Sequence, residues 1–239
     1  FSMYWLGKAR TSATLGAVTL GTNAIDNQFL FCQFKGATTA ASTGILTVGT
    51  GSNSPLTVDN CDFDGSGIAN SCFFATTGVP NVTISNSNFF DYRNGSGVNL
   101  PAGSNTALIE NNSFYQTLPY NGLAGTTYGI NVVGITNGII RNNNIGGSGP
   151  GIIGIWTVTS TTPVAYHFTG ISATSLTTSK VYGNKIQNFD WKCSVATWTG
   201  INAGGTSGSI GTDGANYIGS NTGNDNIKIT YFATGAGQV

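Results

Sequence analysis

The six residues IENNSF at positions 109–114 return as IRNNNI at positions 140–145, and this repetition decides the fold. Each copy has an apolar residue, a variable residue, and then Asn or Gly, usually with a second small polar residue behind it. An aromatic residue or Ile closes the copy. Further copies are FLFCQF at 29–34, VDNCDF at 58–63, ISNSNF at 84–89, VYGNKI at 181–186 and the half copy ANYI at 215–218. A motif that returns at a near-constant period indicates a repeat architecture.

The closing residues give the period of the repeat. They are Phe34, Phe63, Phe89, Phe114, Ile145, Ile186 and Ile218, at separations of 29, 26, 25, 31, 41 and 32 residues. A unit of roughly 25 residues with insertions accounts for all six intervals, whereas a propeller blade needs about 40. Short alternating segments between Gly and Asn turns predict strands. We therefore predict an all-β, right-handed parallel β-helix of about seven to eight rungs, formed as one domain over residues 1–239.

One column of the repeat is expected to adopt a left-handed backbone at a turn. Phe31, Asn60, Asn86, Asn111, Asn142 and Gly183 occupy it. Asn and Gly tolerate a positive φ better than other residues. Because stacked strands lie roughly 4.8 Å apart, these Asn side chains are also expected to form a ladder of amide hydrogen bonds between rungs.

A second strand in each unit begins with Gly or another small residue. Examples are GILTV at 44–48, GVNL at 97–100, GINVV at 129–133, GISA at 170–173 and GINA at 200–203. Such segments alternate between inward and outward side chains, as a strand that covers a core must do.

The composition limits the function classes. Only 8% of the residues are charged, and nine basic residues balance nine acidic ones. A chain without a Lys/Arg cluster is a poor partner for nucleic acid. No apolar run approaches the roughly 20 residues of a membrane span, and no sequence motif calls for a cofactor or a metal ion. The chain does not begin with Met, and we expect it to be a segment of a longer repetitive protein.

The four cysteines do not form a CxxC pair, so neither a zinc site nor a thioredoxin-like motif is indicated. Cys32 and Cys61 occupy the same place in consecutive rungs. Their parallel Cβ atoms would stay near 4.8 Å apart, slightly too far for a disulfide without twisting. We favour two stacked, buried thiols over a Cys32–Cys61 bond, and the disulfide remains the alternative.

Three long intervals, at residues 115–127, 147–168 and 187–199, are expected to be loops. They contain the candidate glycan-binding aromatics Tyr120, Trp156, Tyr166, Trp191 and Trp198, and the only histidine, His167. Loops on a rigid scaffold often carry binding surfaces, and aromatic rings with neutral polar neighbours suit stacking on sugars. The alternative, which we favour, is that these rings pack the insertions against the flank of the helix.

The sequence does not nominate a catalytic centre. Glycoside hydrolysis needs a pair of carboxylates, and the best pair is Asp59 and Glu110, which face outward about 10 Å apart with Ser85 between them. Two stacked surface acids are ordinary in a solenoid, so we assign no catalytic residue. The segment 62–67, DFDGSG, faintly resembles a calcium loop but lacks the terminal bidentate Glu, and a turn is the preferred interpretation.

The later rungs resemble a known style of repeat. The segments that carry the resemblance are GNKI at 183–186, TGINAGG at 199–205, IGT at 210–212, NYIGS at 216–220 and IKIT at 227–230. It resembles the β-helix repeat regions of large Bacteroidota cell-surface adhesins that are exported by type 9 secretion, some of which serve in gliding. The likeness covers mainly residues 128–232, and the earlier rungs match only the general pectate-lyase-like β-helix pattern.

The resemblance implies a non-enzymatic, adhesive or structural segment of a secreted or cell-surface protein. Its implied partners are glycans on polysaccharides or cell surfaces, and neighbouring repeats of the same polypeptide or filament. The alternative is a polysaccharide lyase or hydrolase, or a phage-type depolymerase module. A groove on one sheet, lined by two acids or by an acid with Lys or Arg on adjacent rungs, would favour that alternative.

Overall fold

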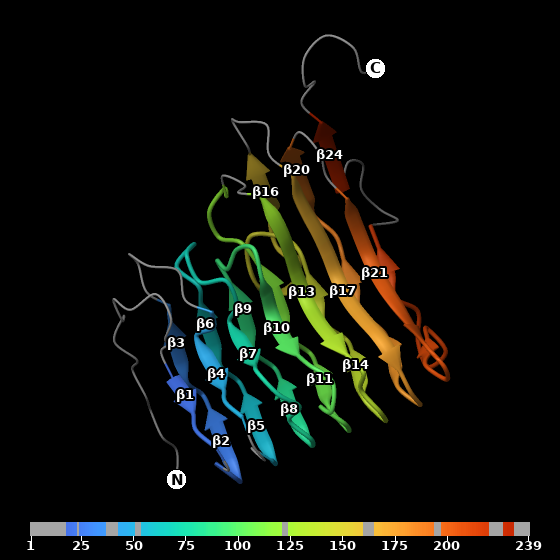
Figure 1. Cartoon of the computed structure of the whole chain (residues 1–239). Helices are drawn as coiled ribbons and strands as arrows, with labels where there is room; N and C mark the ends of the chain where they lie inside the picture. Colours follow the sequence, from blue (N-terminus) through green and yellow to red (C-terminus); the bar gives the residue numbers. More distant parts are fainter. Residues whose placement is uncertain are drawn as a thin grey trace.

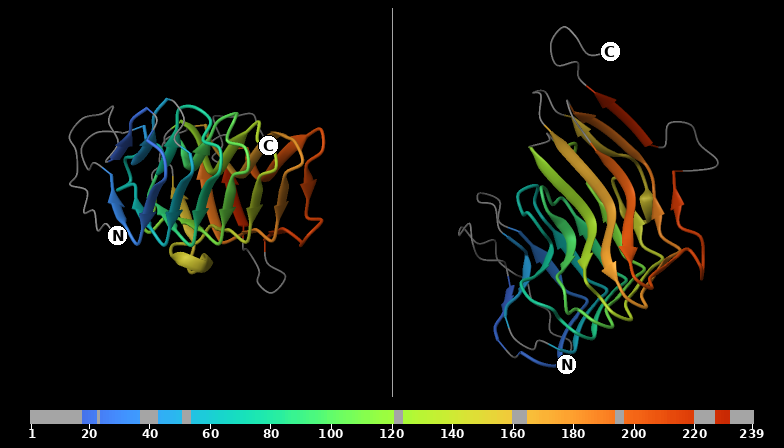
Figure 2. Two further views of the ribbon diagram at one scale, coloured as in Figure 1. Left: turned by 90° about the horizontal axis from the view of Figure 1, so that it is seen from below. Right: turned by 45° about the vertical axis from the view of Figure 1, so that its right-hand side comes forward.

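The computed structural model describes residues 18–22, 24–36, 43–50, 54–120, 124–159, 165–193, 197–219 and 227–231. In these ranges the chain winds into a right-handed parallel β-helix, as predicted. Each turn of the helix, or rung, adds one strand to each of three seven-stranded sheets (Figure 1). The strands of the first sheet lie side by side from β1 to β21, and the two further views show the rungs stacked along one axis (Figure 2).

The three sheets follow one another along each rung. The first contains β1 (Val18–Leu20), β4 (Leu46–Val48), β7 (Phe73–Ala75), β10 (Ser96–Leu100), β13 (Gly125–Val133), β17 (Tyr166–Leu176) and β21 (Trp198–Gly205). The second contains β2 (Asn27–Leu30), β5 (Leu56–Asp59), β8 (Val82–Ser85), β11 (Leu108–Glu110), β14 (Ile139–Arg141), β18 (Lys180–Tyr182) and β22 (Ser209–Ile210). The third contains β3 (Gln33–Lys35), β6 (Asp62–Asp64), β9 (Asn88–Phe90), β12 (Ser113–Tyr115), β15 (Asn144–Ile145), β19 (Lys185–Ile186) and β23 (Tyr217–Ile218).

The closing residues of the repeat form a continuous column in the core. Stacked rings of Phe34, Phe63, Phe89 and Phe114 have centroids 4.5, 4.8 and 5.0 Å apart in turn, with planes within 12° of parallel. The strand register continues the column through Ile145. Parallel pairing in register places each side chain on its own copy, so the same apolar chemistry is needed at this position in every rung.

The expected turn column has a left-handed backbone at each position. The φ angles of Phe31, Asn60, Asn86, Asn111, Asn142 and Gly183 lie between 50° and 67°. These residues join the second sheet to the third, and we call this connection the Asn turn. The Asn side chains of this column are exposed to solvent.

The ladder of amides lies one residue later than expected. Its buried rungs are Asn112, Asn143 and Asn184, each with no measurable exposure. The backbone N–H and the side-chain Nδ2 of Asn143 both donate to Oδ1 of Asn184, at 3.0 and 2.9 Å. Nδ2 also donates to the carbonyl oxygen of Ile109 at 3.0 Å. The side chains thus satisfy buried backbone groups that no strand partner reaches.

Glycines let the first sheet approach the closing column. A Cβ on Gly129 would lie 2.6 Å from the carbonyl oxygen of Gly170 and 3.1 Å from two methyl groups of Ile145. Gly97, Gly170 and Gly200 repeat this relation with Phe114, Ile186 and Ile218. At these four positions the Gly is therefore set by packing, because a side chain would collide with the closing residue of the same rung.

Rungs five to seven carry a fourth sheet, which corrects the prediction that residues 147–168 and 187–199 are loops. This sheet contains β16 (Trp156–Thr159), β20 (Phe189–Cys193) and β24 (Ile227–Tyr231). The facing strands β13, β17 and β21 lengthen to 9, 11 and 8 residues, against three to five in the earlier strands of the first sheet. The inserted segments therefore repeat as strands, and the cross-section of the helix widens between rungs four and five.

A short 3-10 turn, η1 (Pro150–Ile152), interrupts the segment before β16 and projects from the body (Figure 2, yellow). It packs against β12, where the backbone N–H of Gly151 donates to Oγ of Ser113 at 3.2 Å. Ile153, directly after it, is 71% exposed.

Gly129→Ala should destabilise the chain by about 1–3 kcal/mol, because the added methyl group overpacks the core. Gly204→Ala is the matched control, since a Cβ there has no atom within 4 Å. Chemical denaturation of both variants checks the prediction. Equal midpoints for the two variants would contradict the role assigned to the glycine column.

Asn143→Ala should lower the free energy of unfolding by about 3 kcal/mol or more. The substitution leaves several buried hydrogen-bond donors and acceptors without partners, and each such group costs roughly 1–3 kcal/mol. Asn142→Gly should be nearly neutral, because Gly183 already occupies that place in the next rung. Thermal and chemical denaturation measure both. If Asn142→Gly lowered the stability more than Asn143→Ala, the exposed column that contains Asn142, and not the buried one, would form the stabilising ladder.

Candidate functional site

The aromatic residues proposed for glycan contact lie inside the widened rungs. Trp156, Tyr166 and Trp191 have no measurable exposure, and Tyr120 is 8% exposed. The rings of Tyr166 and Trp191 stack with centroids 4.8 Å apart. Trp198 is partly exposed, and its ring packs on Phe168 at 5.6 Å between centroids. These rings fill the space between the first and fourth sheets, so the buried ones offer no face to a ligand.

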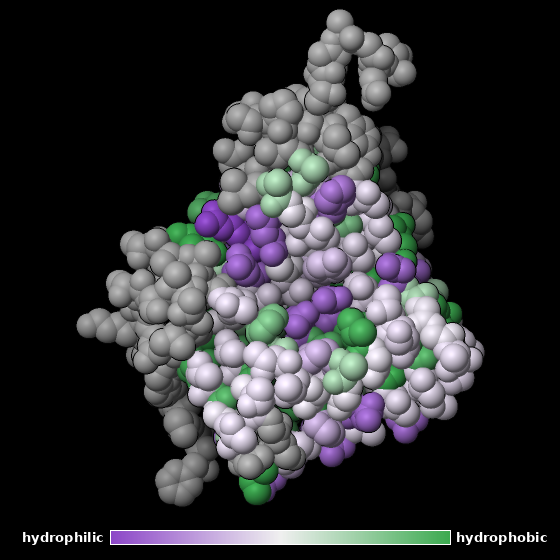
Figure 3. Space-filling view, in the orientation of Figure 1, coloured by the Kyte–Doolittle hydropathy of each residue, from purple (hydrophilic) through white to green (hydrophobic). Residues whose placement is uncertain are grey.

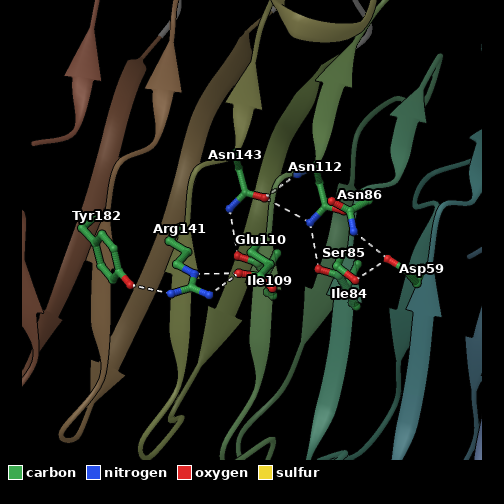
Figure 4. Close-up of polar contacts among 10 residues, drawn as sticks. All are labelled: Asp59, Ile84, Ser85, Asn86, Ile109, Glu110, Asn112, Arg141, Asn143 and Tyr182. Carbon is green, nitrogen blue, oxygen red and sulfur yellow. Dashed lines mark hydrogen bonds and ion pairs between the residues drawn. The ribbon is translucent and has the colours of Figure 1, made fainter. Parts of the chain in front are cut away.

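A row of polar side chains crosses the outer face of the second sheet (Figure 4). It runs from rung to rung through Asp59, Ser85, Glu110, Arg141 and Tyr182, which occupy one register position. Nε and Nη2 of Arg141 both lie 2.6 Å from Oε2 of Glu110, and Nη1 donates to the hydroxyl of Tyr182 at 3.0 Å. Each carboxylate in the row already has partners.

Asp59 shows how this row is stabilised. Burial alone would raise the pKa of its carboxyl, but hydrogen bonds from the side chains of Ser85, Asn86 and Asn60 outweigh it and lower the pKa. These donors lie 2.7, 2.8 and 2.7 Å from the carboxylate oxygens. A carboxylate held ionised in this way is a poor general acid, and its bonds to Ser85 and Asn86 join two rungs. The row therefore has the features of a structural link between neighbouring rungs and not of a catalytic pair of carboxylates.

A pocket of about 450 Å³ opens at the corner between the third and first sheets. Four rungs contribute to it, and we call it the corner pocket. Its lining residues are Lys35, Asp64, Ser66, Gly67, Asp91, Gln116, Leu118, Pro119 and Tyr120. This volume lies within the roughly 300–1,000 Å³ that is typical of small-molecule sites.

The step in cross-section creates the corner pocket. After β12 the chain leaves the narrow rungs and reaches the fourth sheet, where Tyr120 forms a parallel bridge with Val158. The backbone N–H of Tyr120 donates to the carbonyl oxygen of Thr157 at 3.0 Å, and its carbonyl oxygen accepts from the N–H of Thr159 at 2.9 Å. The segment before this anchor, Leu118 and Pro119, forms one wall of the pocket above the corners of the earlier rungs.

The opposite wall is charged. Nζ of Lys35 lies 3.0 Å from Oδ2 of Asp64, and both side chains are partly exposed. Oδ1 of Asp64 accepts from the backbone N–H of Ser66 at 2.7 Å, which fixes the turn after β6. Residues 62–64 of the segment 62–67 thus form the strand β6, and only the residues after Asp64 form a turn, whereas the preferred interpretation was a turn for the whole segment.

Asp91 lies deeper in the same wall and is 8% exposed. Burial raises the pKa of its carboxyl; hydrogen bonds from Thr117 oppose this effect, and the neighbouring charge of Asp64 adds to it. The N–H and Oγ1 of Thr117 donate to Oδ1 and Oδ2 of Asp91 at 2.8 and 2.6 Å. Asp64 and Asp91 are therefore close enough to influence one another, and they belong to adjacent rungs.

The corner pocket was not predicted from the sequence, although Tyr120, one of the predicted contact residues, lines it. Among the other candidates, His167 lies within β17 and not in a loop, and its Nδ1 accepts from the backbone N–H of Thr197 at 2.9 Å. Cys32 and Cys61 are buried free thiols, as favoured, and burial raises the pKa of Cys61 to about 12. The one available signal was the lengthening of the repeat after Phe114, which marks where the cross-section changes.

Comparison with protein-family models, with curated proteins and with solved structures gave no match. None of the described residues belongs to a helix with the length and apolarity that a membrane crossing requires.

The pH dependence of stability should identify Asp91. A carboxyl whose pKa is raised by folding favours the folded state fully below its ordinary value of 3.8 and loses that contribution as the pH rises through the folded pKa. Asp91→Asn, which can keep both contacts with Thr117, should therefore gain stability relative to the parent chain between pH 3 and pH 7. Denaturation midpoints across this range measure the difference.

Asp59→Asn is the matched control and should behave in the opposite way. The pKa of Asp59 is lowered by folding, so its contribution is present above 3.8 and is lost as the pH falls through the folded pKa. Profiles for the two variants that run in parallel would contradict the assigned environments.

Proposed function

We propose that the chain is a non-enzymatic stem segment of a secreted or cell-surface adhesin, which holds contact surfaces at a fixed geometry and meets glycans or other surfaces. Its resemblance to the repeat regions of Bacteroidota adhesins exported by type 9 secretion supports this role. Neighbouring repeats of the same polypeptide or filament are its further proposed partners. In this proposal shape and stiffness carry the function.

One observation supports the stem role most directly: outward polar side chains bond to their counterparts in the next rung. On the second sheet Glu110 pairs with Arg141. On the third, Nδ2 of Asn88 donates to Oδ1 of Asp62 at 2.8 Å. On the first, Nδ2 of Asn131 donates to Oδ1 of Asn99 at 2.9 Å. Such bonds add to the backbone ladders between rungs and oppose sliding and separation.

The visible face over the first sheet fits a contact surface of low charge. Most described residues over β10, β13 and β17 have intermediate hydropathy, and strongly hydrophilic residues form small, separate patches (Figure 3). A surface of hydroxyl and amide groups forms many weak hydrogen bonds and little long-range attraction. Avidity over several repeats would then supply the strength of adhesion.

A second candidate function has one specific observation in its favour. The corner pocket places Lys35, Asp64 and Asp91 on adjacent rungs, which is the acid-with-base arrangement expected of an enzyme that cleaves polysaccharides. In that case Asp91, with its raised pKa, would act as the acid and Asp64 as the base.

A degradation assay decides between the two candidates. The purified chain is incubated with neutral and acidic polysaccharides, and new reducing ends and unsaturated ends are quantified over one day. The stem proposal predicts the same signal as buffer alone. Release of ends that disappears in Asp64→Asn and Asp91→Asn, but persists in Asp59→Asn, would overturn it in favour of the enzyme.

A further inference from the structure

We infer that the corner pocket is a binding subsite for a neutral pyranose unit of a glycan chain. The inference rests on the proposed adhesive function and gives it a location and a class of ligand. It places glycan contact at the step between the narrow and wide rungs, where Tyr120 is the only one of the five suggested aromatic residues in the lining.

The two walls of the corner pocket match the two sides of a pyranose ring. Leu118, Pro119 and Tyr120 line the apolar wall; Tyr120 is only 8% exposed, so Leu118, which is 71% exposed, and Pro119 offer the apolar surface that a ligand can reach. A single exposed apolar side chain is common on protein surfaces, but Leu118 lies in the wall of a cavity, where a ligand can cover it. The C–H face of a sugar ring can cover this wall and remove it from water.

The opposite wall supplies hydrogen-bonding groups for sugar hydroxyls. Lys35 has a side chain that is 59% exposed and three ammonium donors, of which Asp64 needs only one. The carboxylate of Asp64 is 23% exposed and has spare acceptor positions beyond Lys35 and Ser66. Hydrogen bonds to charged groups are stronger than neutral ones, so a hydroxyl pair bridging Lys35 and Asp64 would orient the ring.

The charge balance of the corner pocket selects against acidic sugars. Lys35 is neutralised by Asp64, and Asp91 adds a further carboxyl behind them. A uronate, sulfate or phosphate would meet this carboxyl wall, and juxtaposed like charges are costly. A neutral hexose or pentose meets no such penalty.

An extended peptide is the less suitable occupant. Peptides that add to a sheet use unpaired backbone groups at its edge. Two strands beside the corner pocket are paired on both sides, β6 with β3 and β9, and β12 with β9 and β15. The strand β3, which carries Lys35, is the end strand of its sheet among the described residues. The other lining residues belong to fully paired strands or to turns, so most of the corner pocket offers side chains and no strand edge.

Isothermal titration calorimetry of the full chain tests the inference. The probes are cellohexaose, mannohexaose and xylohexaose as neutral ligands, with hexagalacturonate as their acidic counterpart. We expect at least one neutral hexasaccharide to bind and the acidic one to bind more weakly. Lys35→Met and Leu118→Ser should each raise the dissociation constant of the neutral hexasaccharide about tenfold. This change corresponds to the loss of one hydrogen bond to a charged group or of one apolar contact.

Two variants serve as matched controls and should leave binding unchanged. Lys180→Met removes a lysine from an exposed ion pair with Asp213, far along the stack. Ile153→Ser removes an apolar side chain as exposed as that of Leu118. All four altered residues are partly or largely exposed, so circular dichroism should report unchanged folding.

The outcomes separate the inference from the proposed function. Neutral binding that all four variants retain would overturn the subsite and leave the adhesin proposal standing. Preferential binding of hexagalacturonate, or absence of binding to every neutral probe, would also overturn the subsite. The degradation assay judges the non-enzymatic role independently in each case.

Discussion

Hydrogen bonds between copies of one turn residue connect the rungs of this β-helix. At the Asn turn the backbone N–H of each residue donates to the side-chain acceptor of its counterpart in the next rung. The acceptor is a thiol in Cys61, a hydroxyl in Ser87 and an amide in Asn112, Asn143 and the later rungs. Without such acceptors, one buried N–H group in every rung would lack a hydrogen-bond partner. Each of these groups would lower the free energy of unfolding. The chain can therefore turn sharply between the second and third sheets while the rungs stay stacked.

The same stacking rule explains how the candidate site arises. An insertion in one rung creates a strand only if the next rung carries a matching insertion, and β16, β20 and β24 satisfy this condition. Their aromatic side chains fill the space that the lengthened strands enclose. The first wide rung has no counterpart beneath it, so its leading segment overhangs the narrow rungs. The corner pocket and its exposed Leu118 follow from this single discontinuity.

Repetition made the fold predictable, because the period, the closing column and the left-handed positions are all local in sequence. The ladder was misplaced by one residue because Asn111 and Asn112 are adjacent and equally suited; Gly183, which has no amide, pointed to Asn184. The aromatic insertions were mistaken for loops because they lack the Asn motif, although WTVT at 156–159 alternates as a strand does. The corner pocket was not predictable from spacing, since the wall formed by Leu118 and Pro119 is positioned by the contact of Tyr120 with the fourth sheet, which the repeat pattern does not predict.

Hydrogen exchange of side-chain amides, resolved by NMR, tests the central claim most directly. If the ladder holds the rungs together, the Nδ2 protons of Asn112, Asn143 and Asn184 exchange slowly, because they open only with sub-global unfolding. The exposed amides of Asn111 and Asn142, one residue earlier, exchange at the rate of a free side chain. Fast exchange at the first three positions, or equal protection of both columns, would contradict the account.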